Sequence, residues 1–218
     1  MKPKKQDIKI SLSLLEIDYG ELNAQLERFA PLADWFHVDV MDGNFVPNLS
    51  VGLPVVRAMK TKVPLDCHLM INHPDQYIEP FAKAGATSIT IHAEASTHLK
   101  RDIQLIQKAG CKAGVAINPE TPVSKIAAIL PLVDMILIMS VHPGFGGQTF
   151  SPTVLDKVAW IRSRYPKLSI QIDGGINDKT APLAVQAGAT ILAAGSYITQ
   201  SDNPEVAFRK LTKAVAFL

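Results

Sequence analysis

Four side chains that can bind a metal ion or carry a proton lie in short apolar segments: His37, Asp39, His68 and Asp173. Because His37 and Asp39 are two residues apart, a β-strand would present both on one face. Two imidazoles and two carboxylates form a ligand set that suits Zn, Fe, Co or Mn. A single buried histidine is usually a hydrogen-bonded core residue. Clustered titratable groups are typical of functional sites, so the four together favour a metal-binding or catalytic centre.

Three glycine-rich turns follow later apolar segments of the chain. They are Pro143–Gln148 (with Gly144, Phe145, Gly146 and Gly147), Asp173-Gly174-Gly175, and Gly195-Ser196. Glycine lets backbone N–H groups approach an anion closely. One such turn would be equally consistent with a plain tight loop. Since barrel enzymes build phosphate sites from their late strand–helix loops, three turns in succession favour phosphate binding.

Three methionines, Met41, Met70 and Met139, lie near the ends of apolar segments. Methionine commonly fills irregular gaps in a protein core, which is one interpretation. The other is that the polarisable sulfur atoms line a site and exclude water from an electron-rich intermediate. The sequence leaves both interpretations open.

These residues need a scaffold that brings the ends of several strands together, and the periodicity of the chain predicts one. Eight segments have strand character: Ile8–Ser13, Trp35–Met41, Leu65–Ile71, Ser88–His92, Lys112–Asn118, Met135–Ser140, Ser169–Asp173 and Thr190–Ala194. Helical patterns alternate with them: Tyr19–Ala30, Asp75–Ala84, His98–Ala109, Val123–Leu130, Pro152–Arg164, Lys179–Ala187 and Pro204–Phe217. Alternation of this kind predicts a parallel sheet. Because an open sheet usually has fewer strands, we expect an α/β protein whose residues 1–218 form one (β/α)8 TIM barrel.

Alternate residues of a strand share a face, and the inward face fills the interior of a barrel. This parity places four polar side chains inward near the carboxyl ends of their strands: Ser13, Asp39, His68 and Asp173. Active sites of barrel enzymes lie at that end. We therefore expect the candidate metal ligands to converge on an active site.

Parity also makes predictions about other polar residues. Lys9 and Asp66 face inward lower in the barrel, and we expect them to form an ion pair because a buried charge needs a partner. His92 and Asn118 lie at strand ends and are candidates to line the pocket. The long segment Asn44–Leu53 carries apolar residues that could cover the site or contact a partner subunit.

Composition excludes several classes of protein. A net charge of +2 gives no reason to expect nucleic acid. No apolar run approaches the roughly 18 residues that a membrane span requires. The basic segment Met1–Lys9 lacks the apolar stretch of a secretory signal, so we expect a solvated chain end and a cytoplasmic protein. Cys67 and Cys111 lie in apolar segments without CxxC spacing, which predicts buried, unpaired thiols.

Four segments resemble signatures of the ribulose-phosphate 3-epimerase family: His37–Asn48, Leu65–Met70, Met139–Gln148 and Asp173–Asn177. The similarity runs in order along almost the whole chain. The resemblance implies an isomerase on a (β/α)8 barrel of the ribulose-phosphate-binding type, without an organic cofactor. It also implies interconversion of D-ribulose 5-phosphate and D-xylulose 5-phosphate in the pentose phosphate pathway. Because the family commonly forms dimers or hexamers, a homo-oligomer is expected.

The resemblance assigns roles to the residues already singled out. It implies that His37, Asp39, His68 and Asp173 hold a divalent cation, with Asp39 and Asp173 as the two acid–base groups. Substrate would be bound by Ser13, His68, Gly144, Phe145, Gly146, Gly147, Asp173, Gly174, Gly175, Gly195 and Ser196, and the pocket lined by Met41, Met70 and Met139. One aspartate would remove the C3 proton and the other would deliver a proton to the opposite face, while the metal polarises the C2 oxygen.

The chain departs from the family pattern around the first strand. Ser11-Leu12-Ser13 replaces Ser-Pro-Ser, Leu15–Asp18 replaces a run of small residues, and His142 stands where Asn is common. Relatives that act on D-allulose 6-phosphate have almost the same site, so this sugar is the alternative substrate. A hexulose-phosphate synthase or phosphoribosyl isomerase would share the late glycine turns but lack the four metal ligands. A barrel that binds a sugar phosphate without catalysis is the remaining alternative.

Overall fold

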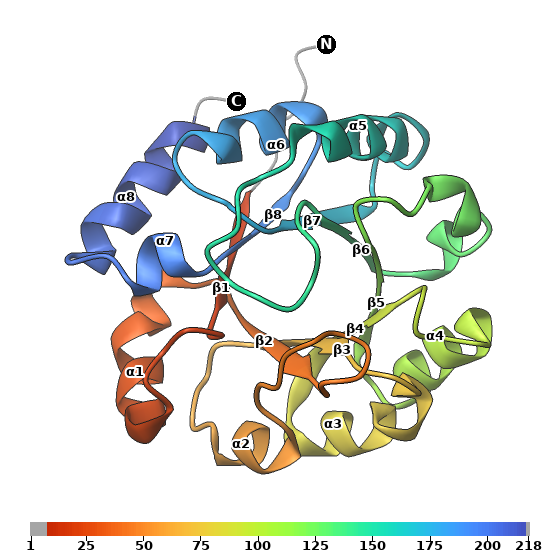
Figure 1. The fold of residues 1–218 in the computed structure, drawn as a ribbon, viewed down its shortest axis with the longest axis horizontal. Helices are drawn as coiled ribbons and strands as arrows, with labels where there is room; N and C mark the ends of the chain where they lie inside the picture. The colour runs from red at the N-terminus through yellow and green to blue at the C-terminus, as the bar shows by residue number, and fades with distance from the viewer. Residues whose placement is uncertain (1–7, 217–218) are drawn as a thin grey trace.

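Eight parallel strands close into a barrel in chain order, with β1 hydrogen-bonded to both β2 and β8 (Figure 1). The structure is a computed structural model that describes residues 8–216, so most of the basic segment Met1–Lys9 and the predicted helical residue Phe217 lie outside the described residues. The strands are β1 (Lys9–Ser13), β2 (Trp35–Met41), β3 (Leu65–Met70), β4 (Ala86–His92), β5 (Lys112–Ile117), β6 (Met135–Met139), β7 (Ser169–Asp173) and β8 (Ile191–Ala194). The predicted (β/α)8 barrel is confirmed.

Helices surround the barrel on its outer side (Figure 1). They are α1 (Leu22–Phe29), α2 (Leu53–Ala58), α3 (Ile78–Ala84), α4 (Leu99–Lys108), α5 (Leu155–Arg164), α6 (Thr180–Ala187), α7 (Ser196–Thr199) and α8 (Pro204–Val215). Gly85 and Gly188 end α3 and α6 in the left-handed conformation, with φ of 112° and 116°. Glycine commonly ends an α-helix in this conformation, because it has no Cβ atom. Within residues 8–216, no helix combines the length and apolar character needed to cross a membrane.

The helix predicted at Val123–Leu130 is wrong. This segment contains two 3₁₀ turns, at Val123–Lys125 and Leu130–Leu132, instead of a continuous α-helix. Val123 and Ile126 are three residues apart, a spacing that buries one face of a 3₁₀ turn as well as of an α-helix, so the apolar pattern did not distinguish the two. The apolar side chains of Ile126 and Leu130 are nevertheless buried, each with 1% exposure. The tighter turns therefore cover the barrel where a helix was expected.

The outward faces of the strands form the apolar core between the barrel and its helices. Val38, Leu69 and Ile172 are fully buried there and belong to one cluster with Phe29 of α1 and Phe81 of α3. Burial of each large apolar side chain contributes about 1.5–3 kcal/mol. Cys67 also faces this cluster, and both it and Cys111 are buried free thiols, as predicted. The outward faces of the strands are therefore apolar, and the polar side chains of the strands lie on the inward faces.

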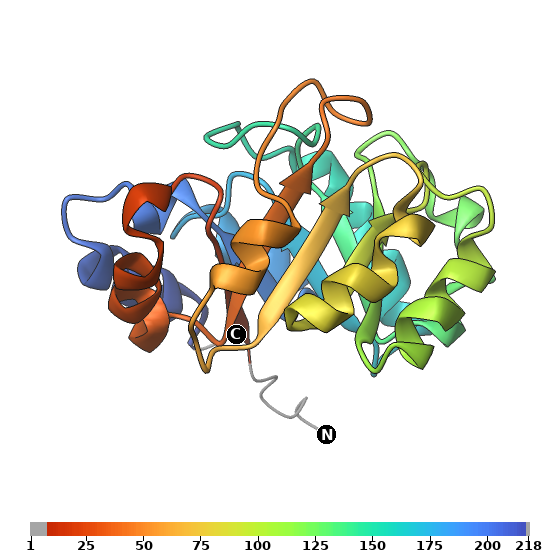
Figure 2. The same ribbon diagram turned by 90° about the horizontal axis from the view of Figure 1, so that it is seen from below.

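Two long segments cover the carboxyl ends of the strands. Figure 2 shows the segments that follow β2 and β6 rising from the same end of the barrel. The Asn48 side-chain amide donates to the Gly144 carbonyl at 2.6 Å and joins the two segments. Asp42 accepts backbone hydrogen bonds from Asn44, Phe45 and Asn72, which orders the turn after β2. This end of the barrel is therefore the enclosed one.

Candidate metal centre and active site

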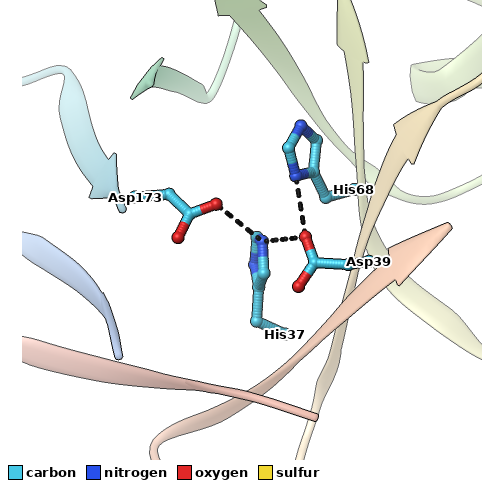
Figure 3. Close-up of side chains that lie close together, drawn as sticks. All are labelled: His37, Asp39, His68 and Asp173. Atoms are coloured by element: carbon cyan, nitrogen blue, oxygen red, sulfur yellow. Dashed lines mark hydrogen bonds and ion pairs between the residues drawn. The ribbon is translucent and has the colours of Figure 1, made fainter. Parts of the chain in front are cut away.

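The four predicted ligands extend from three strands toward one point inside the barrel (Figure 3). His37 and Asp39 come from β2, His68 from β3 and Asp173 from the end of β7. One ligand atom of each residue lies within 4.8 Å of the others. His37 Nε2 is 3.3 Å from Asp39 Oδ1 and 3.9 Å from Asp173 Oδ2, and His68 Nδ1 is 3.1 Å from Asp39 Oδ1. The structure therefore brings together all four residues that the sequence singled out.

The cluster fits a divalent metal ion. His37 Nε2 is buried and makes no hydrogen bond, although two carboxylates lie within 4 Å of it. A buried polar atom without a partner is costly and calls for a physical reason. Imidazole nitrogen and carboxylate oxygen are the donor atoms that Zn, Fe, Co and Mn accept in proteins. A cation at this point would coordinate His37 Nε2 and would neutralise the negative charge of the two carboxylates.

His37 is oriented by a fully buried carboxylate. Asp66 Oδ2 lies 2.8 Å from His37 Nδ1 and also accepts hydrogen bonds from Gln171 and Ser11. A carboxylate only accepts, so Nδ1 carries a proton, and Nε2 is the nitrogen that faces the cluster and is available to a cation. The ion pair predicted between Lys9 and Asp66 is wrong, because Lys9 pairs with Asp34 at 3.1 Å.

The two aspartates of the cluster differ in pKa. Burial raises the pKa of Asp173 to about 7, and the negative charge of Asp39 adds to this effect. Burial also acts against ionisation of Asp39, but His37 and His68 outweigh it and hold the pKa of that carboxyl well below its usual range. One carboxyl therefore favours the charged form near neutral pH while the other can keep its proton. Two acid–base groups with separated pKa values are the arrangement that proton transfer at one carbon requires.

The histidines also differ in pKa. Burial lowers the pKa of His68 to about 4, so this imidazole is neutral. Burial acts in the same direction on His37, but the carboxylates of Asp39 and Asp66 outweigh it and raise its pKa well above the usual value. A neutral imidazole is the form that binds a metal ion. His68 is therefore ready to act as a ligand, whereas His37 must first lose a proton.

A cavity of about 360 Å³ opens above the cluster at the enclosed end of the barrel. Predicted site residues that line it are Ser13, Asp39, Met41, Met70, Met139, Gly144, Phe145, Gly146, Gly147, Asp173, Gly174, Gly175, Gly195 and Ser196. His37 and His68 are fully buried and lie outside this lining. Ser13 Oγ donates to Asp39 Oδ2 at 2.8 Å and orients that carboxylate. The cavity therefore presents both aspartates to whatever molecule enters.

Several lining residues were not predicted. They are Leu15, Glu16, Val141, Ile176, Asn177, Ala193 and Tyr197. Most of them directly follow a strand, and this position was the signal that could have identified them. The predictions that His92 and Asn118 line the pocket are wrong. His92 is fully buried behind His68, at 2.8 Å between their Nε2 atoms.

The late glycine turns pack against one another around the cavity. Gly175 has φ of 59°, and a Cβ atom at this position would lie 2.5 Å from the Phe150 nitrogen. Such a distance is far below van der Waals contact, so only glycine permits the turn after β7 to approach the segment after β6. Two late loops are thereby held together beside one cavity.

Solved structures of other barrel enzymes share this fold at low sequence identity. KGPDC from Streptococcus mutans has a TM-score of 0.77 at 15% identity, covering 97% of this chain and 98% of that chain. A 3-hexulose-6-phosphate synthase from Salmonella typhimurium has a TM-score of 0.73 at 18% identity, covering 96% of this chain and 99% of its own. At such identities the similarity establishes the fold alone.

Sequence comparison identifies the family, which the structural similarity does not. A ribulose-phosphate 3-epimerase from Bacillus subtilis is 47% identical over 205 residues, which is 90% of this chain and 94% of the relative. The cytoplasmic isoform of ribulose-phosphate 3-epimerase from Oryza sativa is 42% identical over 214 residues, 95% of this chain and 94% of the relative. The family model described as the Ribulose-phosphate 3 epimerase family matches residues 9–199. The chain therefore belongs to the ribulose-phosphate 3-epimerase family.

Proposed function

We propose that the protein is an isomerase that inverts C3 of a ketose phosphate and interconverts D-ribulose 5-phosphate with D-xylulose 5-phosphate. The observation that carries this proposal is the pair of carboxyl groups, Asp39 and Asp173, that face one cavity from β2 and β7. Inversion by two distinct groups needs an acid and a base on opposite faces of the reacting carbon. The curated relatives at 42% and 47% identity carry the name of this activity.

The aspartates exchange roles between the two directions of the reaction. In one direction Asp39 accepts the C3 proton, and the electron pair of the broken C–H bond moves toward the C2 carbonyl. Asp173 then donates its proton to the opposite face of C3, and the electron pair returns to form the new C–H bond. A divalent cation held by His37, Asp39, His68 and Asp173 would supply positive charge that stabilises the negative charge developing at the C2 oxygen. After one turnover the protonation states are reversed, so the same site is ready for the other epimer.

Three methionines lie around the proposed position of the reacting carbon. Met41, Met70 and Met139 line the cavity with at most 5% exposure. Exclusion of water strengthens every electrostatic interaction with a developing charge. The methionines thus support the site by position, without taking part in proton transfer.

Backbone amides are proposed to bind the phosphate. The cavity lining includes Gly146, Gly147, Gly175 and Ser196, and among the described lining residues there is no Lys or Arg. N–H groups of glycine turns can surround a phosphate without a cationic side chain. This anchor fixes the sugar so that C3 lies between the two aspartates.

Gly175→Ala is expected to raise KM for the phosphate substrate by about tenfold or more, because a Cβ atom at a strained left-handed position must displace one loop from the other. Steady-state kinetics measures this effect. Gly110→Ala is the matched control, since Gly110 also has positive φ (82°) but a Cβ atom there meets nothing within 4 Å. An unchanged KM in Gly175→Ala would contradict the assignment of this turn to phosphate binding.

Turnover on two candidate substrates tests the proposed function directly. We expect the purified protein to epimerise D-ribulose 5-phosphate with a higher kcat/KM than D-allulose 6-phosphate, because its curated relatives are named for the former. In D₂O each conversion should place one deuterium at C3, which NMR detects. Faster turnover of the six-carbon sugar would reassign the substrate. Binding of both sugars without conversion of either would indicate a non-catalytic barrel.

Finer properties of the protein are part of the same proposal. We infer that the resident cation is Zn, Fe, Co or Mn, since two imidazoles and two carboxylates accept each of them.

Leu49 is 73% exposed and Phe145 is 54% exposed on the segments that cover the site, which supports a homo-oligomer that buries them. The buried free thiols of Cys67 and Cys111 support a location in the reducing cytoplasm.

A further inference from the structure

A buried hydrogen-bonded chain leaves the metal cluster through His68 and ends at a carboxylate. His68 Nε2 lies 2.8 Å from His92 Nε2, and His92 Nδ1 lies 3.3 Å from Glu94 Oε2. Both imidazoles are fully buried, and their rings meet edge to edge, with centroids 5.0 Å apart and ring planes at 23° to each other. The Phe45 ring packs on His92 at 4.8 Å between centroids. The chain is therefore shielded from water along the length of both rings.

Glu94 accepts hydrogen bonds on both of its oxygens. Oε2 faces His92, while Oε1 accepts from the Asn118 backbone N–H at 2.9 Å and from the Thr121 hydroxyl at 2.5 Å. Lys157 donates to the carbonyls of Asn118, Pro119 and Thr121 and holds this loop around the carboxylate. Burial acts against ionisation of Glu94, but the bonds from His92, Asn118 and Thr121 outweigh it and lower the pKa of the carboxyl. Glu94 is thus a charged acceptor with a fixed orientation.

With one proton on each imidazole, the chain between the two carboxylates has two consistent proton arrangements. In the outward arrangement His68 Nε2–H donates to His92 Nε2, and His92 Nδ1–H donates to Glu94. In the inward arrangement His92 Nε2–H donates to His68 Nε2, and His68 Nδ1–H donates to Asp39, 3.1 Å away. Only the outward arrangement leaves a lone pair on His68 Nδ1, the nitrogen that faces the cluster. Because a cation replaces that proton, the inward arrangement competes with metal binding.

We propose that Glu94 is a positioning residue that holds His92 and His68 in the outward tautomers and thereby frees His68 Nδ1 to bind the cation. Each arrangement leaves one nitrogen lone pair facing a carboxylate: that of His92 Nδ1 faces Glu94 in the inward arrangement, and that of His68 Nδ1 faces Asp39 in the outward one. A bound cation would accept the His68 Nδ1 lone pair and remove the second penalty, so Glu94 and the cation favour the same arrangement. Asp39 alone would stabilise the inward tautomers, whereas Glu94 stabilises the outward ones. This inference rests on the proposed cation site, and not on the identity of the sugar.

Glutamine cannot replace this carboxylate. Its single carbonyl oxygen can face either His92 or the pair formed by Asn118 N–H and Thr121. If the oxygen stays with Asn118, the amide NH₂ meets His92 Nδ1 and requires a lone pair there, which selects the inward tautomers. If the amide is turned, its NH₂ meets the backbone N–H of Asn118. Glu94→Gln therefore favours the state in which His68 Nδ1 carries a proton.

The experiment compares Glu94→Gln with Glu120→Gln, which changes an exposed carboxylate of the neighbouring loop after β5. Titration of each cation-free protein with Zn²⁺ should give a dissociation constant about tenfold higher for Glu94→Gln, the lower end of the effect of losing a direct partner of a metal-binding histidine, because Glu94 acts on His68 only through His92. Glu120→Gln should bind as the wild type does. Long-range ¹H–¹⁵N NMR of the cation-free proteins should find a larger fraction of His92 protonated at Nδ1 in the wild type and Glu120→Gln than in Glu94→Gln.

The outcomes separate this inference from the proposed function. Equal Zn²⁺ affinity and equal tautomers in Glu94→Gln and wild type would overturn it. Failure of the wild type to bind any divalent cation would instead reject the metal site itself. If Glu94→Gln does not fold, His92→Phe serves as a second variant, because it removes the outward acceptor of His68 next to Phe45. A similar loss of affinity is expected there, and wild-type affinity in a folded His92→Phe would equally overturn the inference.

Discussion

Asp39→Asn and Asp173→Asn are each expected to lower the turnover of D-ribulose 5-phosphate by about 10³-fold, since an amide of the same size cannot accept or deliver a proton. The effect should be large for both variants because inversion needs a group on each face of C3. Steady-state kcat on purified protein is the measurement. Near-normal turnover in either variant would contradict a mechanism with two acid–base groups.

These substitutions also touch the cation site, so two controls accompany them. Metal content is measured for each variant, and kcat is compared at saturating cation so that loss of metal is separated from loss of a proton carrier. Asp156→Asn, an exposed carboxylate of α5, should have wild-type kcat. Exchange of the C3 proton with D₂O gives a further test: a variant with one remaining aspartate should still exchange the proton of one epimer without converting it to the other.

Removal of the cation is expected to lower kcat by about 10²-fold or more, because a Lewis acid supplies several kcal/mol of charge stabilisation in the transition state. Exhaustive treatment with a chelator, followed by gel filtration and assay, measures the loss. Addition of Zn²⁺, Mn²⁺, Co²⁺ or Fe²⁺ should restore turnover, and the most effective ion identifies the preferred metal. A cation-free protein with full activity would reject the assignment of the cluster to a metal.

The affinity of the cation-free protein for the cation should depend on pH in a defined direction. Asp173, with a pKa of about 7, and His37, with a raised pKa, must both lose protons before they can bind the cation. Asp39 is already ionised and His68 is already neutral. Affinity should therefore rise as pH increases through about 7 and fall below it, with protons released on binding. Calorimetry in buffers of different ionisation enthalpy counts these protons, and an affinity independent of pH would contradict the assignment.

Much of the barrel and of its site could be predicted because side chains along a strand alternate between its two faces. His37 and Asp39 had to share a face, and the apolar Val38 between them had to face the helices. The same rule placed His68 and Asp173 inward on β3 and β7. The four candidate metal ligands could therefore be predicted from local sequence patterns alone.

Parity gives the face of a residue but not its level in the barrel. Asp66 is paired in register with His37, and His37 with Ser13, whereas Lys9 is paired with Ile191. Lys9 precedes Ser13 by four residues, a separation of about 13 Å along a strand at about 3.3 Å per residue. The stagger between strands, which no single segment encodes, is why the predicted Lys9–Asp66 pair was wrong.

Other features depend on contacts that are distant in the chain. The apolar pattern of Val123–Leu130 fits 3₁₀ turns as well as an α-helix, so the local sequence could not decide between them. Glu94 was not recognisable as a partner of the metal site, because its role arises only when β3 and β4 lie side by side and His92 meets His68. Residues that act through a neighbouring strand carry no local signal of their own.

The interior of this barrel has a consequence for its resistance to heat. Asp39, Asp66 and Asp173 lie where a purely structural barrel would be filled by branched apolar side chains. A cation bound among residues of β2, β3 and β7 would connect distant parts of the sheet, and only the folded chain brings these residues together. Binding to the folded state alone adds about 2.7 kcal/mol when the free ion is at about 100 times its dissociation constant. The supply of divalent ions would then determine the melting temperature of the protein as well as its rate.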